Sequence, residues 1–151
     1  MAEHSHSELK PEVQRAALLK LPLLGPVLWL YARDERRKWT FPADHEWLLL
    51  PPLMLDQYRL YSRRDVPSAF FTWAFVTDDV DRRLRSGEQR LAPQEWNQGL
   101  HCWLIDCVAP FGGRDDWLTQ LRQRELKGCT VNRLIVENQR TAIVQTLSAL
   151  A

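Results

Sequence analysis

The stretch that decides the fold runs from Trp96 to Gly113 and reads W-N-Q-G-L-H-C-W-L-I-D-C-V-A-P-F-G-G. Its centre, residues 102–111, is almost wholly apolar and is closed by Pro110 and two glycines, which predicts a buried strand ending in a sharp turn. One acid, Asp106, lies inside it. Because a buried carboxylate is costly unless it is paired or hydrogen-bonded, Asp106 either caps a turn or pairs with a nearby arginine, or it belongs to a functional site.

The length and composition are those of an ordinary globular protein. Its 151 residues predict a single domain over 1–151, of which residues 1–9 form a flexible polar tail. A net charge of +1 argues against a dedicated nucleic-acid-binding protein, which is usually clearly basic. The three cysteines show no C-x-x-C spacing, so we expect neither a disulfide framework nor a metal site.

The N-terminus has no signal-peptide layout. The longest apolar run, residues 21–31, is broken by Pro22 and Pro26, so we expect no membrane span. With unpaired cysteines, these features favour a cytoplasmic protein.

Hydrophobic periodicity predicts helices over 10–20, 26–33, 78–85, 115–127 and 141–150. Pro22 is expected to end the first of them. Strands are predicted over 47–50, 57–62, 69–76, 102–111 and 130–137, with Pro51-Pro52 stopping the first. Since helices and strands mix without regular βαβ alternation, we predict an α+β fold with a mostly antiparallel central sheet flanked by helices.

Two histidines are candidates for a catalytic role. His101 lies five residues before Asp106, which in a regular strand puts the two on opposite faces, so a direct dyad would need a bulge. His45 lies in the loop F-P-A-D-H-E-W, where it is either bonded locally or a catalytic partner. Glycine-rich phosphate loops and the G-x-S-x-G motif are absent from the sequence.

The charged cluster at residues 33–38 is R-D-E-R-R-K. It is either a solvated helix end, with cations near the helix C-terminus, or a basic rim for an acidic partner.

Three segments carry a resemblance to a known family: L-G-P-V-L-W-L-Y (24–31), D-Q-Y-R-L-Y-S-R-R-D-V-P-S-A-F-F-T-W-A (56–74) and the E-W-N-Q-G-L-H-C-W-L-I-D-C-V-A-P-F-G-G block (95–113). In order and spacing the chain resembles the toxin-activating lysine acyltransferases of the haemolysin C type. The resemblance implies a GNAT-like acyltransferase fold. It also implies transfer of a fatty acyl group from acyl-carrier protein to internal lysines of an RTX protoxin in the cytoplasm, with no bound cofactor.

The family's essential aspartate falls on Asp106. Its essential histidine, in a segment that typically reads S-P-L-H-R-x-W, falls on Arg36 or Arg37, where this chain has D-E-R-R-K-W. Arginine stays protonated above pH ~12 and cannot act as a general base, but it can stabilise an oxyanion or hold a carboxylate.

Three outcomes follow from the missing histidine. His45 moves into the site as a replacement, Asp106 is the sole base with reduced activity, or the protein no longer acylates lysine. The catalytic candidates are therefore Asp106 and His45. Arg36, Arg37 and Lys38 are the candidates for binding the acidic carrier or the thioester oxygen.

A second hypothesis is a histidine-lacking homologue that acts as a subunit. Relatives of this kind in bacteriocin pathways belong to complexes that join a siderophore to a microcin precursor peptide. A partner subunit then supplies the missing chemistry, and exposed aromatic surface would mark the interface. A homodimer is the other assembly that the sequence leaves open.

Overall fold

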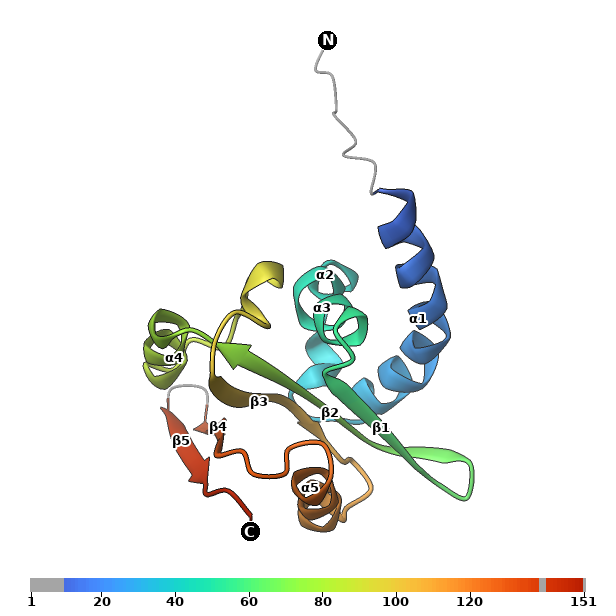
Figure 1. Cartoon of the computed structure of the whole chain (residues 1–151). Helices are drawn as coiled ribbons and strands as arrows, with labels where there is room; N and C mark the ends of the chain where they lie inside the picture. The colour runs from blue at the N-terminus through green and yellow to red at the C-terminus, as the bar shows by residue number, and fades with distance from the viewer. Residues whose placement is uncertain (1–9, 139–140, 151) are drawn as a thin grey trace.

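A five-stranded sheet forms the centre of the protein in a computed structural model, which describes residues 10–138 and 141–150 (Figure 1). The strands follow one another across the sheet in the order β1 (Tyr58–Arg63), β2 (Val66–Val76), β3 (His101–Val108), β4 (Val131–Asn138) and β5 (Thr141–Leu147). All neighbours are antiparallel except β3 and β4, which are parallel. The predicted α+β class is confirmed, and the arrangement is consistent with a GNAT-like fold. The predicted tail over 1–9 lies outside the described residues.

Helices cover both faces of the sheet. On one face, α5 (Arg114–Gln123) buries Leu118 and Leu121 against the aromatic side chains of β2. The other face carries α1 (Pro11–Tyr31), α2 (His45–Leu48) and α3 (Leu50–Met54), and α4 (Asp78–Arg85) packs near the start of β3. Short 3-10 turns at Arg37–Trp39, Pro42–Asp44 and Pro93–Glu95 connect these elements.

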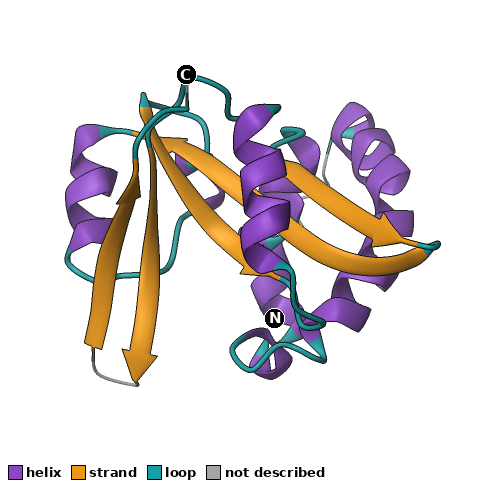
Figure 2. Cartoon of the chain, turned by 90° about the horizontal axis from the view of Figure 1, so that it is seen from below, coloured by secondary structure: helices purple, strands orange, loops and turns teal. Residues whose placement is uncertain are grey.

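The parallel pair of strands is joined only at one end. Cys102–Leu104 of β3 pair with Val131–Arg133 of β4, and beyond them the two strands diverge, as Figure 2 shows. The β4–β5 hairpin therefore leans away from the rest of the sheet. This divergence opens the middle of the molecule next to the second half of β3, where Asp106 lies.

The predicted break at Pro22 is wrong, because residues 11–31 form one helix that contains both Pro22 and Pro26. A proline removes the hydrogen bond to the carbonyl four residues earlier. Leu18, Pro22 and Pro26 lie four residues apart along one stripe of α1, and Leu18 and Pro22 are exposed. Water can therefore satisfy the freed carbonyls, while Val27 and Leu30, farther along the helix, are buried against the sheet.

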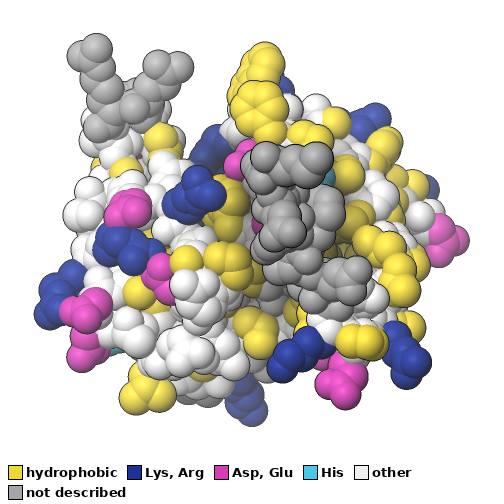
Figure 3. All heavy atoms as spheres, turned by 90° about the horizontal axis from the view of Figure 1, so that it is seen from above, with side chains coloured by type: hydrophobic (Ala, Val, Ile, Leu, Met, Phe, Trp, Pro, Cys, Tyr) yellow, Lys and Arg dark blue, Asp and Glu magenta, His cyan; other side chains and the backbone are white. Residues whose placement is uncertain are grey.

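The uninterrupted α1 is long and apolar enough, by length and composition, to cross a membrane. Core helices of soluble proteins can have the same length and composition. The C-terminal end of α1 belongs to the core, whereas its first part is largely solvent-exposed and includes Leu18, Leu19 and Leu21. Apolar side chains reach the surface in several places in the face shown in Figure 3.

Two other predicted elements change type. The predicted strand over 47–50 is helical, because Pro51 and Pro52 occupy the first turn of α3, where a missing N–H costs nothing, instead of stopping a strand. The predicted closing helix over 141–150 is strand β5, which pairs with β4 from Thr141 to Leu147. Its Thr, Ile and Val residues favour a strand, and β4 offers them a partner.

Gly99, at the start of the stretch that decides the fold, provides a test of this packing. Its N–H donates to the Phe75 carbonyl (3.1 Å), and an added Cβ would lie 2.0 Å from the Val76 carbonyl oxygen. We expect Gly99→Ala to lower the free energy of unfolding by about 2 kcal/mol or more, because the backbone must move apart. Urea denaturation measures this change.

Gly25→Ala is the matched control, since a Cβ at Gly25 would meet nothing within 4 Å. Because Gly25 lies inside α1, this substitution should leave stability unchanged or raise it by up to about 1 kcal/mol. Equal stability of the Gly99→Ala variant and the wild type would contradict the close approach of residues 96–99 to β2.

Candidate functional site

A β-bulge in β3 aims Asp106 toward α1. Thr72 pairs with Asp106 and Trp73 with Leu104, so Ile105 has no partner of its own on β2. The extra residue puts Asp106 on the same face as Phe70 and Val108. Its N–H donates to the Thr72 hydroxyl (3.0 Å), which replaces the backbone partner.

The Asp106 carboxylate is fully buried and has a partner on each oxygen. Arg37 Nε donates to Oδ1 (2.6 Å), and the Tyr31 hydroxyl donates to Oδ2. Arg37 also reaches the Ile105 carbonyl (3.4 Å). We call Tyr31, Asp106 and Arg37 the Asp106 cluster. It unites the end of α1, the bulge of β3 and the turn that follows α1.

The electrostatics of the Asp106 cluster follow from this burial. Burial, reinforced by the Asp106 charge, raises the pKa of Tyr31 well above its ordinary value, so Tyr31 stays a neutral donor. Burial opposes the charge of Arg37, but the Asp106 carboxylate outweighs it and raises the pKa of Arg37. Asp106 does pair with an arginine, as one of the sequence-based alternatives expected, but its partner Arg37 is 69 residues away in the sequence and not nearby.

A cleft of about 190 Å³ lies beside the Asp106 cluster, between the diverging strands β3 and β4. Four arginines and two aspartates line it, together with an apolar wall from both strands: Asp34, Arg36, Arg37, Leu104, Ile105, Asp106, Cys107, Val108, Arg114, Arg133, Leu134, Ile135 and Val136. The excess of guanidinium groups makes the cleft suited to an anionic or strongly polarised ligand.

The turn after α1 supplies two of these arginines. The Asp34 carboxylate accepts hydrogen bonds from the backbone N–H groups of Arg36 (3.0 Å) and Arg37 (2.9 Å), which fixes the turn. Arg36 reaches across to Gln89 Oε1 (2.6 Å). Partial desolvation of this largely exposed side chain, reinforced by the charge of Arg37, lowers the pKa of Arg36 from its ordinary value. An anion between these two side chains would relieve their repulsion.

The remaining predicted residues lie elsewhere. Lys38 pairs with Glu35 (2.9 Å), lies over the Trp39 ring and does not line the cleft. His45 is the first residue of α2 and is partly buried. Within residues 10–138 and 141–150, no hydrogen bond or ion pair joins His45 to Asp106, and His45 does not line the cleft.

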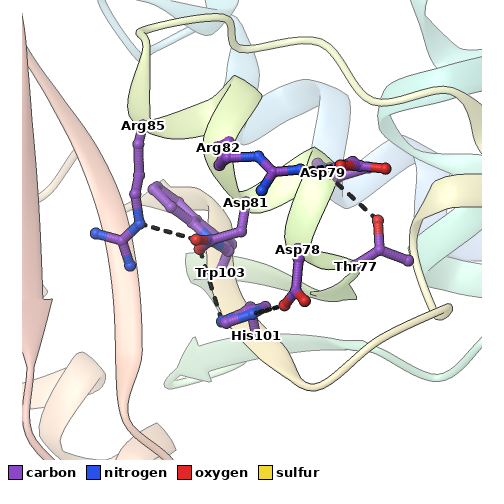
Figure 4. Close-up of polar contacts among 9 residues, drawn as sticks. Thr77, Asp78, Asp79, Asp81, Arg82, Arg85, His101 and Trp103 are labelled. Atoms are coloured by element: carbon purple, nitrogen blue, oxygen red, sulfur yellow. Dashed lines mark hydrogen bonds and ion pairs between the residues drawn. The ribbon is translucent and has the colours of Figure 1, made fainter.

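His101 belongs to a different cluster, although the bulge that a dyad with Asp106 would need is present. Figure 4 shows its ring turned toward α4, where Nε2 lies 2.6 Å from Asp78 Oδ1 and Nδ1 lies 3.8 Å from Asp81 Oδ1. Asp81 also accepts hydrogen bonds from Trp103 Nε1 (2.8 Å) and Arg85 Nε (2.9 Å). Five residues of strand separate His101 from Asp106, roughly 16 Å.

Sequence reasoning missed three residues of the site. Tyr31 was predicted only as an apolar helix residue and Arg133 only as part of a strand, and Arg114 fell in no predicted element. The order L-W-L-Y places Tyr31 on the buried stripe with Val27, which is the one available signal. In the described part of the chain, no group of three or more His, Cys, Asp or Glu side chains could hold a metal ion.

Fold and site together define an acyltransferase-like α+β domain, with an open cleft between two parallel strands and a buried carboxylate at its side. The chain belongs to the RTX toxin acyltransferase family, whose sequence profile matches residues 16–148. The suggested resemblance is thereby confirmed.

Individual relatives agree with this family assignment. The chain is 32% identical over 102 residues to an RTX-III toxin-activating lysine-acyltransferase of Actinobacillus pleuropneumoniae, covering 67% of this chain and 58% of the relative. It is 34% identical over 95 residues to a lysine-acyltransferase of Vibrio cholerae, covering 57% of this chain and 62% of the relative. It is 30% identical over 108 residues to a protein-lysine myristoyltransferase of Escherichia coli, covering 69% of this chain and 61% of the relative. The chain thus spans about three fifths of the length of these relatives.

The hydrogen bonds that Asp81 accepts from Arg85 and Trp103 predict a pH dependence of stability. Burial opposes ionisation of Asp81, but the hydrogen bonds from Arg85 and Trp103 outweigh it and hold the pKa of Asp81 below its ordinary 3.8. Ionised Asp81 therefore stabilises the fold above pH about 4, and this contribution is lost as the pH falls through the lower folded value. Trp103→Phe removes one donor, so its deficit in melting temperature should be largest near pH 7 and narrow below pH 4.

Trp96→Phe is the matched control. Trp96 is also fully buried, but its Nε1 donates to the Trp47 carbonyl (3.0 Å), which does not titrate. The deficit in melting temperature of Trp96→Phe relative to the wild type should not depend on pH. Equal pH dependence of the two deficits would contradict the role of Trp103.

Proposed function

We propose that this protein is a lysine acyltransferase that moves a fatty acyl group from acyl-carrier protein to a lysine of an RTX-type toxin. The observation that carries the proposal is the arginine-lined cleft beside Asp106, which is the aspartate of the family's W-L-I-D-x-x-A-P-F-G block. Membership of the RTX toxin acyltransferase family supports it, as do relatives named toxin-activating lysine-acyltransferases.

The charge of the cleft suits the proposed donor. Acyl-carrier protein is acidic and bears its acyl group as a thioester on a phosphate-containing arm. Arg36 and Arg37 face the cleft, while Lys38 and Arg33 lie on the exposed turn outside it. These cations would guide the acidic carrier toward the cleft opening, as complementary charges do at other interfaces. Such an encounter takes place in the cytoplasm, where acyl-carrier protein is found.

Apolar side chains of both strands would receive the start of the acyl chain. Leu134 and Val136 on β4 face the cleft together with Leu104 and Ile105 on β3. An open cavity of about 190 Å³ holds only a part of a long acyl chain, because a buried cavity of about 150 Å³ accommodates a molecule the size of benzene. The rest of the chain would lie outside the cleft.

A second candidate function is that of a subunit in a peptide-modification complex, such as one that joins a siderophore to a microcin precursor peptide. Two observations favour it: arginines occupy the place of the family histidine, and both oxygens of Asp106 are already engaged. In that case the protein needs a partner subunit for catalysis.

The test of the primary proposal is mass spectrometry of an RTX-toxin fragment incubated with the protein and acyl-loaded carrier. We expect a fatty-acyl mass increase on lysine, and at least about a 100-fold loss of transfer in Asp106→Asn, because the neutral amide no longer holds the charged Arg37. Asp79→Asn is the control: Asp79 is an exposed acid that pairs with Arg82 on α4, and this variant should transfer at the wild-type rate.

The His45→Ala variant tests whether His45 takes part in catalysis. Since His45 makes no contact with Asp106 in the described structure, we expect transfer within about twofold of the wild type. A loss as large as that of Asp106→Asn would instead identify His45 as the base. Absence of transfer by the folded protein with every acyl chain tested, combined with co-purification of a partner subunit, would replace the first function by the second.

A further inference from the structure

The arrangement of the Asp106 cluster decides which group faces the substrate. Oδ1 and Oδ2 of Asp106 each accept a hydrogen bond, and the side chain has no exposed surface. A general base must lie within hydrogen-bond reach of the proton that it removes. An incoming amine cannot reach the Asp106 carboxylate, so Asp106 does not fill that role in this structure.

Tyr31 does not fill it either. Its side chain is 2% exposed and packs edge-on against Phe70, with ring centroids 6.2 Å apart. Its hydroxyl donates to Asp106, and burial keeps the pKa of Tyr31 well above its ordinary value. Tyr31 therefore fixes the orientation of Oδ2 and leaves Oδ1 directed at Arg37.

Arg37 and Asp106 both line the cleft, but the Arg37 side chain is 16% exposed, whereas that of Asp106 has no exposed surface. The Nε of Arg37 is held by Asp106, and its Nη2 lies 3.4 Å from the Ile105 carbonyl. Among residues 10–138 and 141–150, no side chain or carbonyl accepts a hydrogen bond from Arg37 Nη1. A guanidinium has only donors and stays charged, so it can bind an oxygen that becomes negative but cannot accept a proton.

We propose that Tyr31 and Asp106 are positioning residues that aim the Arg37 guanidinium into the cleft as the oxyanion donor, and that the acceptor lysine enters already neutral, without a general base from the protein. This inference rests on the proposed acyl transfer. It assigns the role of oxyanion donor to Arg37, at the position where the family resemblance implies a histidine.

The chemical step balances without a protein base. The neutral lysine amine attacks the thioester carbonyl carbon, a C–N bond forms, and the carbonyl electron pair moves to the oxygen beside Arg37. The tetrahedral intermediate then collapses, the C–S bond breaks, and the carrier leaves as a thiolate. The thiolate takes the proton that the amine nitrogen gives up, so the products are the amide and the free carrier thiol.

The surroundings favour a neutral amine. The titratable and charged groups that face the cleft come from the turn after α1, from β3, from the start of α5 and from β4: Asp34, Arg36, Arg37, Asp106, Cys107, Arg114 and Arg133. Cations outnumber acids, and Asp106 is already paired, so an entering ammonium is repelled. Burial raises the pKa of Cys107 above its ordinary value, so its thiol is not a competing base near neutral pH.

The pH dependence of transfer tests the inference. Without a protein base, the rate at low acceptor concentration should rise about tenfold per pH unit from pH 6 to 8, following the neutral fraction of a lysine whose unperturbed pKa is about 10.4. Arg37→His introduces a base with an unperturbed pKa of about 6.5, so its profile should level off near pH 7. Arg37→Lys loses the fork of donors and should lower kcat by about 100-fold.

Tyr31→Phe tests the positioning role. It should lower kcat by about tenfold and leave KM for the carrier nearly unchanged, because Arg37 loses its orientation while the cleft stays open. Tyr58→Phe is the matched control, since Tyr58 also packs against Phe70 but lies on β1 away from the cleft. It should leave kcat and the pH profile unchanged.

The outcomes separate this inference from the proposed function. A wild-type profile that levels off near pH 7, or a Tyr31→Phe variant with wild-type kcat, overturns the inference while acyl transfer stands. Transfer by Arg37→His alone, from an inactive wild type, also overturns it, because Arg37 would then not support the reaction. No transfer by the folded wild type or any variant overturns the proposed function and this inference with it.

Discussion

The structure depends on one buried ion pair, that of Asp106 with Arg37. A carboxylate without solvent contact is tolerated only because a guanidinium lies 2.6 Å from one oxygen and the Tyr31 hydroxyl donates to the other. Removing one partner of such a pair typically costs about 3–5 kcal/mol, whereas replacing the pair by apolar groups is often neutral. A buried pair is therefore a poor way to gain stability. Its presence next to a cleft is better explained by the position that it gives to Arg37.

Several local features exist to bring these groups together. The bulge opposite Thr72 rotates Asp106 toward α1, and the Thr72 hydroxyl satisfies the N–H that the bulge releases. The continuous α1 carries Tyr31 to the same point, and Asp34 fixes the turn that returns Arg37. The short pairing of β3 with β4 leaves the space into which Arg37 faces. Each feature is modest alone, and together they over-determine the position of the guanidinium.

Much of this could be predicted from the sequence, for physical reasons. The strand around Asp106 is strongly apolar, and the strands in 57–62 and 69–76 are rich in aromatic residues. Helix α4 has an N-cap, an acidic first turn and a Ser-Gly end, so these elements were placed correctly. The errors came where tertiary contacts override local signals. Two prolines did not break α1, because the carbonyls that they free belong to the exposed residues Leu18 and Pro22. Pro51-Pro52 lie in the first turn of a helix, and β5 depends on an edge that only the folded sheet provides.

The site was predictable only in part. Asp106 was conspicuous as an acid in an apolar run, and Arg36 and Arg37 followed from the motif around Trp39. Tyr31 was not, because a tyrosine on an apolar helix face has no sequence signal that tells a hydrogen-bonding role from simple packing. Arg133 lines the cleft from the last residue of β4 that pairs with β3, and no periodicity encodes where that pairing ends.

The most direct measurement is a double-mutant cycle on the free energy of unfolding, with Arg37→Gln, Asp106→Asn and the two combined. If the buried ion pair organises the site, each single substitution is strongly destabilising, and the double variant loses much less than the sum of the two. Additive losses would contradict the pairing and, with it, the position assigned to Arg37.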